Sequence, residues 1–200
     1  MIPDDVFKIF STATMLFLVF DPLGNLPLFV SLLKQCDGAG YRRIVARESC
    51  IALGVLMLFL LFGNRILLLL QISEGSLGIA GGVILFLIAL KMVFGSPQFG
   101  SDRQMHEPFI VPLAVPLFAG PGAVTMTILV RGEDMPSFFL GLFALIPAWA
   151  ASALILLAGR KLGDLFGPRG LDALQSLMGF LLAAISVGML LNGIKTAFHL

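Results

Sequence analysis

Residues 20–27, with the sequence FDPLGNLP, interrupt a long apolar segment near the start of the chain. A second interruption, PLFAGPG at residues 116–122, lies within an apolar segment of the second half. Proline has no N–H group and its ring clashes with the carbonyl four residues earlier, so a regular helix is not expected to continue through either motif. In a membrane, irregular backbone is tolerated only where it is buried in protein or lines a cavity. The sequence therefore predicts two interrupted membrane helices, one in each half of the chain.

The composition is typical of an integral membrane protein. Hydrophobic residues make up 58% of the chain and charged residues only 12%, and the mean hydropathy is +1.00. In soluble domains about a quarter of all residues are charged. The formal net charge is +1 and the basic residues are scattered singly, so no patch for nucleic acid is expected. We therefore predict an all-α integral membrane protein, with lipid around it, that does not bind nucleic acid.

Apolar segments bounded by charged residues, glycine and proline predict six transmembrane helices. Residues 1–94 form a first three-helix repeat, residues 95–108 a polar cytoplasmic linker, and residues 109–200 a second three-helix repeat. The first and fourth spans are those interrupted at the membrane midplane. The expected spans cover about 7–33, 44–70, 76–94, 109–130, 137–158 and 171–197.

The two halves have the pattern of diverged copies of one unit. A shift of 98 positions places Phe20 on Phe118 and Gly24 on Gly122. In each half an interrupted span is followed by two continuous spans. Because three is an odd number, the second copy must enter the membrane in the opposite orientation. The predicted fold is therefore a 3+3 inverted repeat, an arrangement common among transporters.

The Lys and Arg residues predict the orientation, because cytoplasmic loops carry most of the basic residues of a membrane protein. The loops after spans 1, 3 and 5 contain most of them and are expected in the cytoplasm, so both termini are expected outside the inner membrane. The basic residues on the expected cytoplasmic side are Lys34, Arg42, Arg43, Arg47, Lys91, Arg103, Arg160, Lys161 and Arg169.

Asp21 lies near the centre of the first span. A carboxylate at this depth is costly, so such acids face the protein interior and commonly mark a functional site. Asp is a preferred N-cap and Pro a preferred first helical residue, so Asp21 and Pro22 are expected to start a half-helix with Asn25 one turn later. Two roles stay open for Asp21, namely capping this half-helix only or also binding a solute.

The second half-helix is expected to start at residues 120–122. Glycines leave backbone N–H groups accessible to a small ligand, and a helix N-terminus favours a carboxylate. Carbonyls freed by the prolines, such as that of Leu18, suit an ammonium group or a cation. Facing half-helices of this kind match a small zwitterion, although prolines in membrane helices often only kink them. The candidate binding residues are Asp21, Pro22, Gly24, Asn25, Pro27, Ala119, Gly120, Pro121, Gly122 and Thr125.

No motif indicates catalysis. The chain contains no Gly-x-Ser-x-Gly and no His-Glu-x-x-His, and we expect no second acid within the membrane to pair with Asp21. The spacing of Cys36 and Cys50 fits no metal or redox motif. We therefore predict that the protein is not an enzyme and has no catalytic residue, metal site or cofactor.

The two interruptions closely resemble motifs of the MarC/SnatA family of bacterial and archaeal membrane proteins. The residues that carry the resemblance are FDPLGNLPLF at 20–29 and PLAVPLFAGPGA at 112–123, and it extends over essentially the whole chain. Phe118 occupies a position where the family often has an aliphatic residue, which could alter the size of a pocket.

The resemblance implies a substrate that the residue pattern does not supply. Members of the family are described as transporters of small neutral amino acids such as glycine and alanine, and the motifs point to Asp21, Gly24, Asn25 and residues 120–122. The expected mechanism is alternating access of a secondary transporter, with Asp21 holding the ammonium group or a coupling proton. A proton or Na⁺ as coupling ion, the direction of transport and a homo-oligomeric state stay open. The alternatives are an exporter or channel for another small solute, a membrane enzyme and a non-transporting partner protein.

Overall fold

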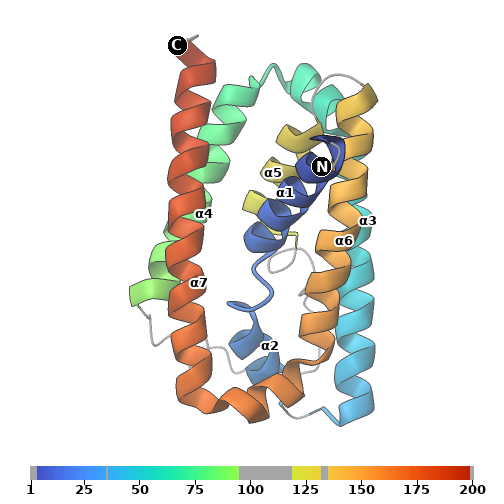
Figure 1. Ribbon diagram of the computed structural model, residues 1–200, viewed down its shortest axis with the longest axis vertical. Coiled ribbons are helices and arrows are strands. Elements are labelled where there is room, and N and C mark those ends of the chain that lie inside the picture. The colour runs from blue at the N-terminus through green and yellow to red at the C-terminus, as the bar shows by residue number, and fades with distance from the viewer. Residues whose placement is uncertain (1–3, 35, 95–118, 132–134, 199–200) are drawn as a thin grey trace.

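The computed structural model describes residues 4–34, 36–94, 119–131 and 135–198, and within these ranges every regular element is a helix (Figure 1). The expected linker 95–108 and residues 109–118 of the second motif and its span lie outside the described residues. The helices are α1 (Asp4–Phe20), α2 (Leu26–Leu32), α3 (Gly38–Leu70), α4 (Glu74–Phe94), α5 (Pro121–Arg131), α6 (Met135–Leu157) and α7 (Gly159–Phe198).

Four of the described helices, α3, α4, α6 and α7, are long and apolar enough to cross a membrane, and the apolar part of α1 (Val6–Phe20) is shorter. Large apolar side chains on several helices are exposed, among them Leu69 at 83% and Phe94 at 78%. Such exposure is unfavourable in water and is expected where lipid surrounds the protein. The structure thus supports an all-helical integral membrane protein that crosses the membrane several times.

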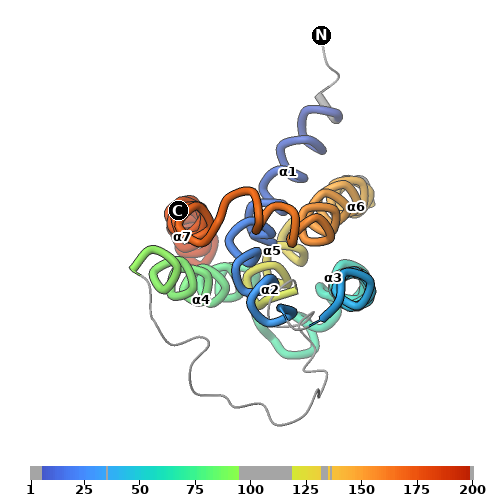
Figure 2. The backbone as a smooth tube through the Cα atoms, turned by 90° about the horizontal axis from the view of Figure 1, so that it is seen from below, coloured from blue at the N-terminus to red at the C-terminus, as the bar shows by residue number. Residues whose placement is uncertain are grey.

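The helices form a bundle in which α2, α5 and the end of α1 are central and α3, α4, α6 and α7 lie around them, while the first part of α1 projects outward between α6 and α7 (Figures 1 and 2). The most extensive pairing joins α4 to α7, and α3 packs against α6. The central α5 contacts α1, α3, α4 and α6, whereas α2 contacts α7. The segments around the two sequence interruptions therefore lie inside the bundle.

Helix α3 begins six residues before the expected span, at Gly38. The side chain of Asp37 caps it by accepting the backbone N–H of Gly40 at 2.8 Å, and this bond satisfies one of the helix's first donors. Arg42 and Arg43 point outward while Tyr41 is buried, so the charged residues that bounded the expected span lie on the exposed face of a continuing helix.

Helix α7 contains a kink at Gly167, which has φ 63° and ψ 175°. This backbone conformation is accessible to glycine without a steric penalty, and Pro168 follows at a position suited to the start of a helix. The segment before the kink, residues 159–166, runs across one end of the bundle, and the segment after it runs along the bundle beside α4 (Figure 1).

Glycines let α4 and α7 approach until their backbones touch. A Cβ atom added to Gly193 would lie 2.8 Å from the carbonyl oxygen of Gly75, and one added to Gly75 would lie 2.9 Å from that of Gly193. A Cβ atom added to Gly179 would lie 3.0 Å from the carbonyl oxygen of Ala89 near the other end of α4, so the two helices run antiparallel. Small residues produce this kind of close packing in lipid, where the hydrophobic effect does not drive helices together.

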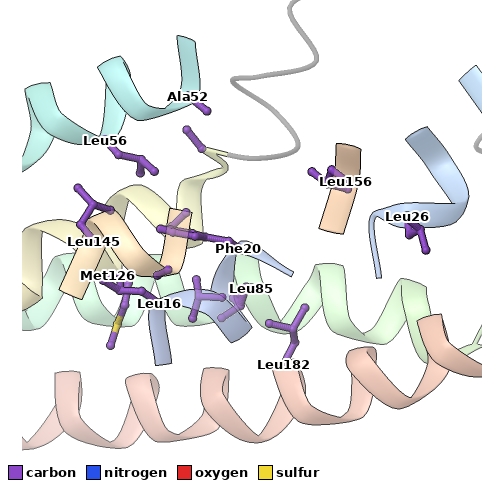
Figure 3. Close-up of a cluster of buried hydrophobic side chains, with 14 of the residues drawn as sticks. Leu16, Phe20, Leu26, Ala52, Leu56, Leu85, Met126, Leu145, Leu156 and Leu182 are labelled. Atoms are coloured by element: carbon purple, nitrogen blue, oxygen red, sulfur yellow. The ribbon is translucent and has the colours of Figure 1, made fainter. Parts of the chain in front are cut away.

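A cluster of buried apolar side chains fills the space between the central and surrounding helices (Figure 3). Leu16 and Phe20 come from α1, Leu85 from α4, Met126 from α5 and Leu145 from α6, and each is less than a tenth exposed. The cluster fixes the end of α1 and the start of α5 relative to α4 and α6.

The contact between Gly193 and Gly75 predicts a position-specific effect on stability. Gly193→Ala should lower the thermal midpoint of the purified protein in detergent, because the added methyl meets backbone atoms, and overpacking of this kind costs about 1–3 kcal/mol. The unfolding can be followed by the fluorescence of the one tryptophan, Trp149.

Gly188→Ala is the matched control on the same helix. Nothing lies within 4 Å of a Cβ atom at Gly188, and alanine favours a helix over glycine by up to about 1 kcal/mol, so the midpoint should stay or rise. Equal midpoints for the two variants would contradict the close approach of α4 and α7.

Candidate functional site

The first interruption is a single turn closed by Asp21. Helix α1 ends at Phe20, and Asp21 has φ 48°, a left-handed conformation that Asp tolerates better than most residues. The backbone N–H of Gly24 donates to Oδ1 of Asp21 at 3.0 Å, and that of Asn25 donates to the Asp21 carbonyl at 3.0 Å. One acidic residue thus satisfies two donors of the interrupted backbone.

Helix α2 begins at Leu26, with Asn25 as its N-cap and Pro27 in its first turn. The expectation that Asp21 and Pro22 start this half-helix is therefore wrong, because the positive φ of Asp21 and the turn after it delay the regular helix. Pro27, rather than Pro22, occupies the favoured position for proline at a helix start.

The carbonyl groups at the end of α1 are also paired. The Leu18 carbonyl, which the sequence suggested would be free, accepts the N–H of Asp21 at 3.2 Å. The side-chain Nδ2 of Asn25 donates to the carbonyl of Phe20 at 3.3 Å. In this conformation the Leu18 carbonyl therefore has a hydrogen-bond partner within the protein.

The residues of the first interruption are largely enclosed. Asp21 is 4% exposed and Pro22 and Gly24 are buried, whereas Asn25 and Pro27 are half-buried. A Cβ atom at Gly24 would overlap the carboxyl group of Asp21 and the terminal methyl of Met92 on α4. Only glycine therefore leaves room for the Asp21 carboxyl group in its present position.

The second interruption leads directly into α5. This helix begins at Pro121, where the sequence predicts it, and the N–H of Val124 donates to the Gly120 carbonyl at 3.0 Å. Ala119 and Gly122 are buried, Gly120 is half-buried and Pro121 is exposed. Because the first donors of a helix have no partner within it, the N–H groups at the start of α5 are suited to an anionic group.

Helix α4 supports both interruptions on one face. Met92 lies against Gly24, and Leu85 lies against Gly122, whose added Cβ would come within 2.9 Å of the Leu85 side chain. Leu85 and Met92 are two turns apart, about 10 Å along the helix. Thr125, which is 5% exposed, packs against Gly81 one turn earlier on α4. The candidate residues of the two motifs are thus gathered along a short length of α4.

Glu48 is a buried acid that the sequence interpretation missed. It is 2% exposed on α3, and its Oε1 accepts Nη2 of Arg47 at 2.6 Å. The expectation of no second acid within the membrane is wrong, since Glu48 lies inside the expected span 44–70. Its spacing from Tyr41, Val45 and Ala52 would have placed it on the buried face.

A cavity of about 370 Å³ lies between α1, α4, α5 and α7. Met15, Met126 and Met189 line it together with Gly78, and Glu74 lies at the end near the start of α4. The cavity does not reach Asp21 or residues 120–122. Met126, which directly follows Thr125, belongs both to the cavity wall and to the buried cluster.

Among the described residues no group of three or more His, Cys, Asp or Glu could hold a metal ion.

Comparison with known proteins places the chain in a family. The model of the MarC family integral membrane proteins matches residues 6–198. The UPF0056 membrane protein BU449 of Buchnera aphidicola (from Acyrthosiphon pisum) is 42% identical over 192 residues, covering 96% of this chain and 98% of the relative.

Two further relatives agree with this match. The UPF0056 inner membrane protein YhgN of Escherichia coli K12 is 42% identical over 191 residues, covering 94% of this chain and 96% of the relative. A UPF0056 membrane protein of Chlamydia muridarum is 34% identical over 195 residues, covering 96% of each chain. No solved structure matches the chain. The chain is therefore a member of the MarC family of integral membrane proteins.

Proposed function

We propose that this protein is a secondary transporter that moves small neutral amino acids of the glycine and alanine class across the inner membrane. The observation that carries the proposal is the gathering of two helix interruptions on one face of α4, with the buried carboxyl group of Asp21 beside them. Interrupted helices inside a membrane bundle supply the polar backbone groups that bind a solute in transporters. The substrate class comes from the resemblance of the two motifs to those of amino acid transporters.

In the proposed binding mode, each charged group of a zwitterion binds at a different interruption. Asp21 would receive the ammonium group or exchange a coupling proton, because it is the acid closest to the broken backbone. The N–H groups of Gly122 and Ala123 at the start of α5 would receive the carboxylate. Gly24 and Gly122 carry no side chain, and Met92 and Leu85 already pack against them, so a bound solute would have to be small.

The proposed architecture is the six-span inverted repeat, with both termini outside. Two antiparallel pairs support it, since an inverted repeat requires each helix to run against its counterpart. Helices α4 and α7 are antiparallel, and so are α3 and α6, because the Trp149 indole donates to the Ser49 carbonyl at 2.8 Å while Gly141 lies against Leu60. Transport would proceed by rocking the two halves around the site.

Uptake by purified protein in proteoliposomes tests the proposal. Labelled glycine and alanine should accumulate saturably and compete with other small neutral amino acids. Imposed proton and Na⁺ gradients, compared with neither, would identify the coupling ion. No movement of any amino acid under any gradient would refute the substrate class. Flux of a different small solute would instead support the exporter or channel alternative, and no flux at all would support a non-transporting partner protein.

Variants at Asp21 separate a binding role from a capping role. Asp21→Asn keeps an oxygen that can accept the Gly24 N–H but removes the charge. If the carboxylate binds the ammonium group or a proton, both Asp21→Asn and Asp21→Ala should reduce uptake by roughly tenfold or more, equivalent to about 1.4 kcal/mol. Full uptake by Asp21→Asn with loss in Asp21→Ala would show that Asp21 only caps the turn.

Gly24 offers a second test of the site. In Gly24→Ala the new methyl must displace the Asp21 carboxyl group or Met92, so uptake should fall while the protein still inserts in the membrane. Gly54→Ala on α3 is the control, because nothing lies within 4 Å of a Cβ atom there. Similar uptake by both variants would argue against a site at the first interruption.

A further inference from the structure

Tyr41 and Arg160 join the two halves of the chain at one end of the bundle. The hydroxyl of Tyr41, a 1% exposed residue of α3, donates to the carbonyl of Leu156 at the end of α6 at 2.9 Å. The guanidinium of Arg160 lies over the Tyr41 ring, 5.5 Å from its centroid. Nη2 of Arg160 also donates to the carbonyls of Cys36 and Lys34 in the segment before α3.

The packing beneath these contacts is tight. A Cβ atom at Gly159 would overlap the Tyr41 hydroxyl and come within 3.0 Å of the Leu26 side chain on α2. A Cβ atom at Gly163 would meet both terminal methyls of Val30 at 3.4 Å. The segment 159–166, which crosses this end of the bundle in Figure 1, therefore covers α2, the helix that follows the first interruption.

The two ends of the bundle differ in how closely they are packed. The end that holds Tyr41 and Arg160 contains the described connections after the first and fifth expected spans, both of which are expected in the cytoplasm. The cavity of about 370 Å³ lies toward the opposite end, near Glu74 and Thr196. A solute-sized space thus exists toward the end expected outside, while the end expected in the cytoplasm is covered.

We propose that the contacts of Tyr41 and Arg160 form the closed cytoplasmic gate of the transporter, and that the cavity is its outer vestibule. The structure is then an outward-facing conformation in which Asp21 is still enclosed by the apolar cluster. For a solute to leave toward the cytoplasm, segment 159–166 must move away from Tyr41 and α2. That this opening releases a solute rests on the proposed function. Whether Tyr41 and Arg160 hold this end closed can be measured without a substrate.

The chemistry of the contacts suits a reversible closure. Tyr41 and Arg160 donate to backbone carbonyls, and water can take over both sides of these hydrogen bonds when the segments separate. The half-exposed Arg160 keeps its charge at the membrane surface, so opening does not require moving a charge into lipid. No covalent change or cofactor is needed.

The native Cys36 reports on the gate, because its own carbonyl accepts the Arg160 hydrogen bond and its side chain is half-buried. The rate of its reaction with a maleimide is measured in the full-length Cys50→Ser protein. Arg160→Ala and Tyr41→Phe should each raise the rate several-fold. Lys161→Ala, which removes an exposed neighbouring cation, should leave it unchanged. An unchanged rate in both gate variants, or an equal rise in Lys161→Ala, would overturn the proposal.

A cysteine placed in the cavity should respond to the same variant in the opposite direction from Cys36. Gly188→Cys places a thiol in the cavity wall at a position with free space, in a protein whose native cysteines are replaced by serine. If the ends open alternately, Arg160→Ala should slow the labelling of this cysteine while it speeds the labelling of Cys36. Faster labelling at both positions would indicate general loosening and would contradict a gate.

The labelling also separates the gate from the proposed function. Saturating alanine should change the Cys36 rate in the otherwise native protein if amino acids are the substrate. A reciprocal response to Arg160→Ala without any response to alanine or other neutral amino acids supports the gate and contradicts the substrate class. No reciprocal response overturns the gate, even if the uptake measurements confirm transport.

Discussion

Backbone polar groups inside a bilayer must find partners within the protein, and this constraint shapes the structure around the first interruption. Pro22 and Pro27 each lack an N–H group, so a continuous helix would leave carbonyls unpaired. The carbonyls of Leu18 and Leu23 instead accept the N–H groups of Asp21 and Leu26. The Asp21 carboxylate and the Asn25 amide pair two further groups, the N–H of Gly24 and the carbonyl of Phe20. A conformation that freed these groups for a solute would need the solute itself to replace the lost hydrogen bonds.

Helix α4 turns two local interruptions into one site. It packs against α7 through backbone contacts at glycines, and these contacts fix the adjoining surface that carries Leu85 and Met92. Leu85 and Met92 then hold the interruptions of two chain segments that are far apart in sequence. Because α4 is the common support, a small shift of this helix relative to α5 would change both halves of the site at once.

The sequence alone predicted those helix ends that one residue type imposes. It did not predict the features that depend on how the helices pack. Proline and glycine predicted the interruption after Phe20 and the start of α5 at Pro121. The start of α2 at Leu26 depends on the left-handed conformation of Asp21, which no composition rule specifies. Glu48 lay inside the expected span 44–70 but was missed, because its burial follows from the face of α3 that packs inward and not from the residue type. The relation of both motifs to α4 is tertiary and has no sequence signal.

In the proposed transport cycle, the enclosure of Asp21 and the position of the cavity correspond to one state. A carboxylate that is 4% exposed is not accessible to a solute from either end, yet the cavity wall at Met126 is adjacent in sequence to Thr125 of the candidate site. Methionine side chains are flexible and tolerate repacking, so Met15, Met126 and Met189 form a wall that can yield without unfolding a helix. The end expected in the cytoplasm is instead held by specific donors, Tyr41 and Arg160, beside the closely packed Gly159. An apolar, adaptable barrier at one end and a hydrogen-bonded one at the other would let one end open while the other stays closed, which alternating access requires.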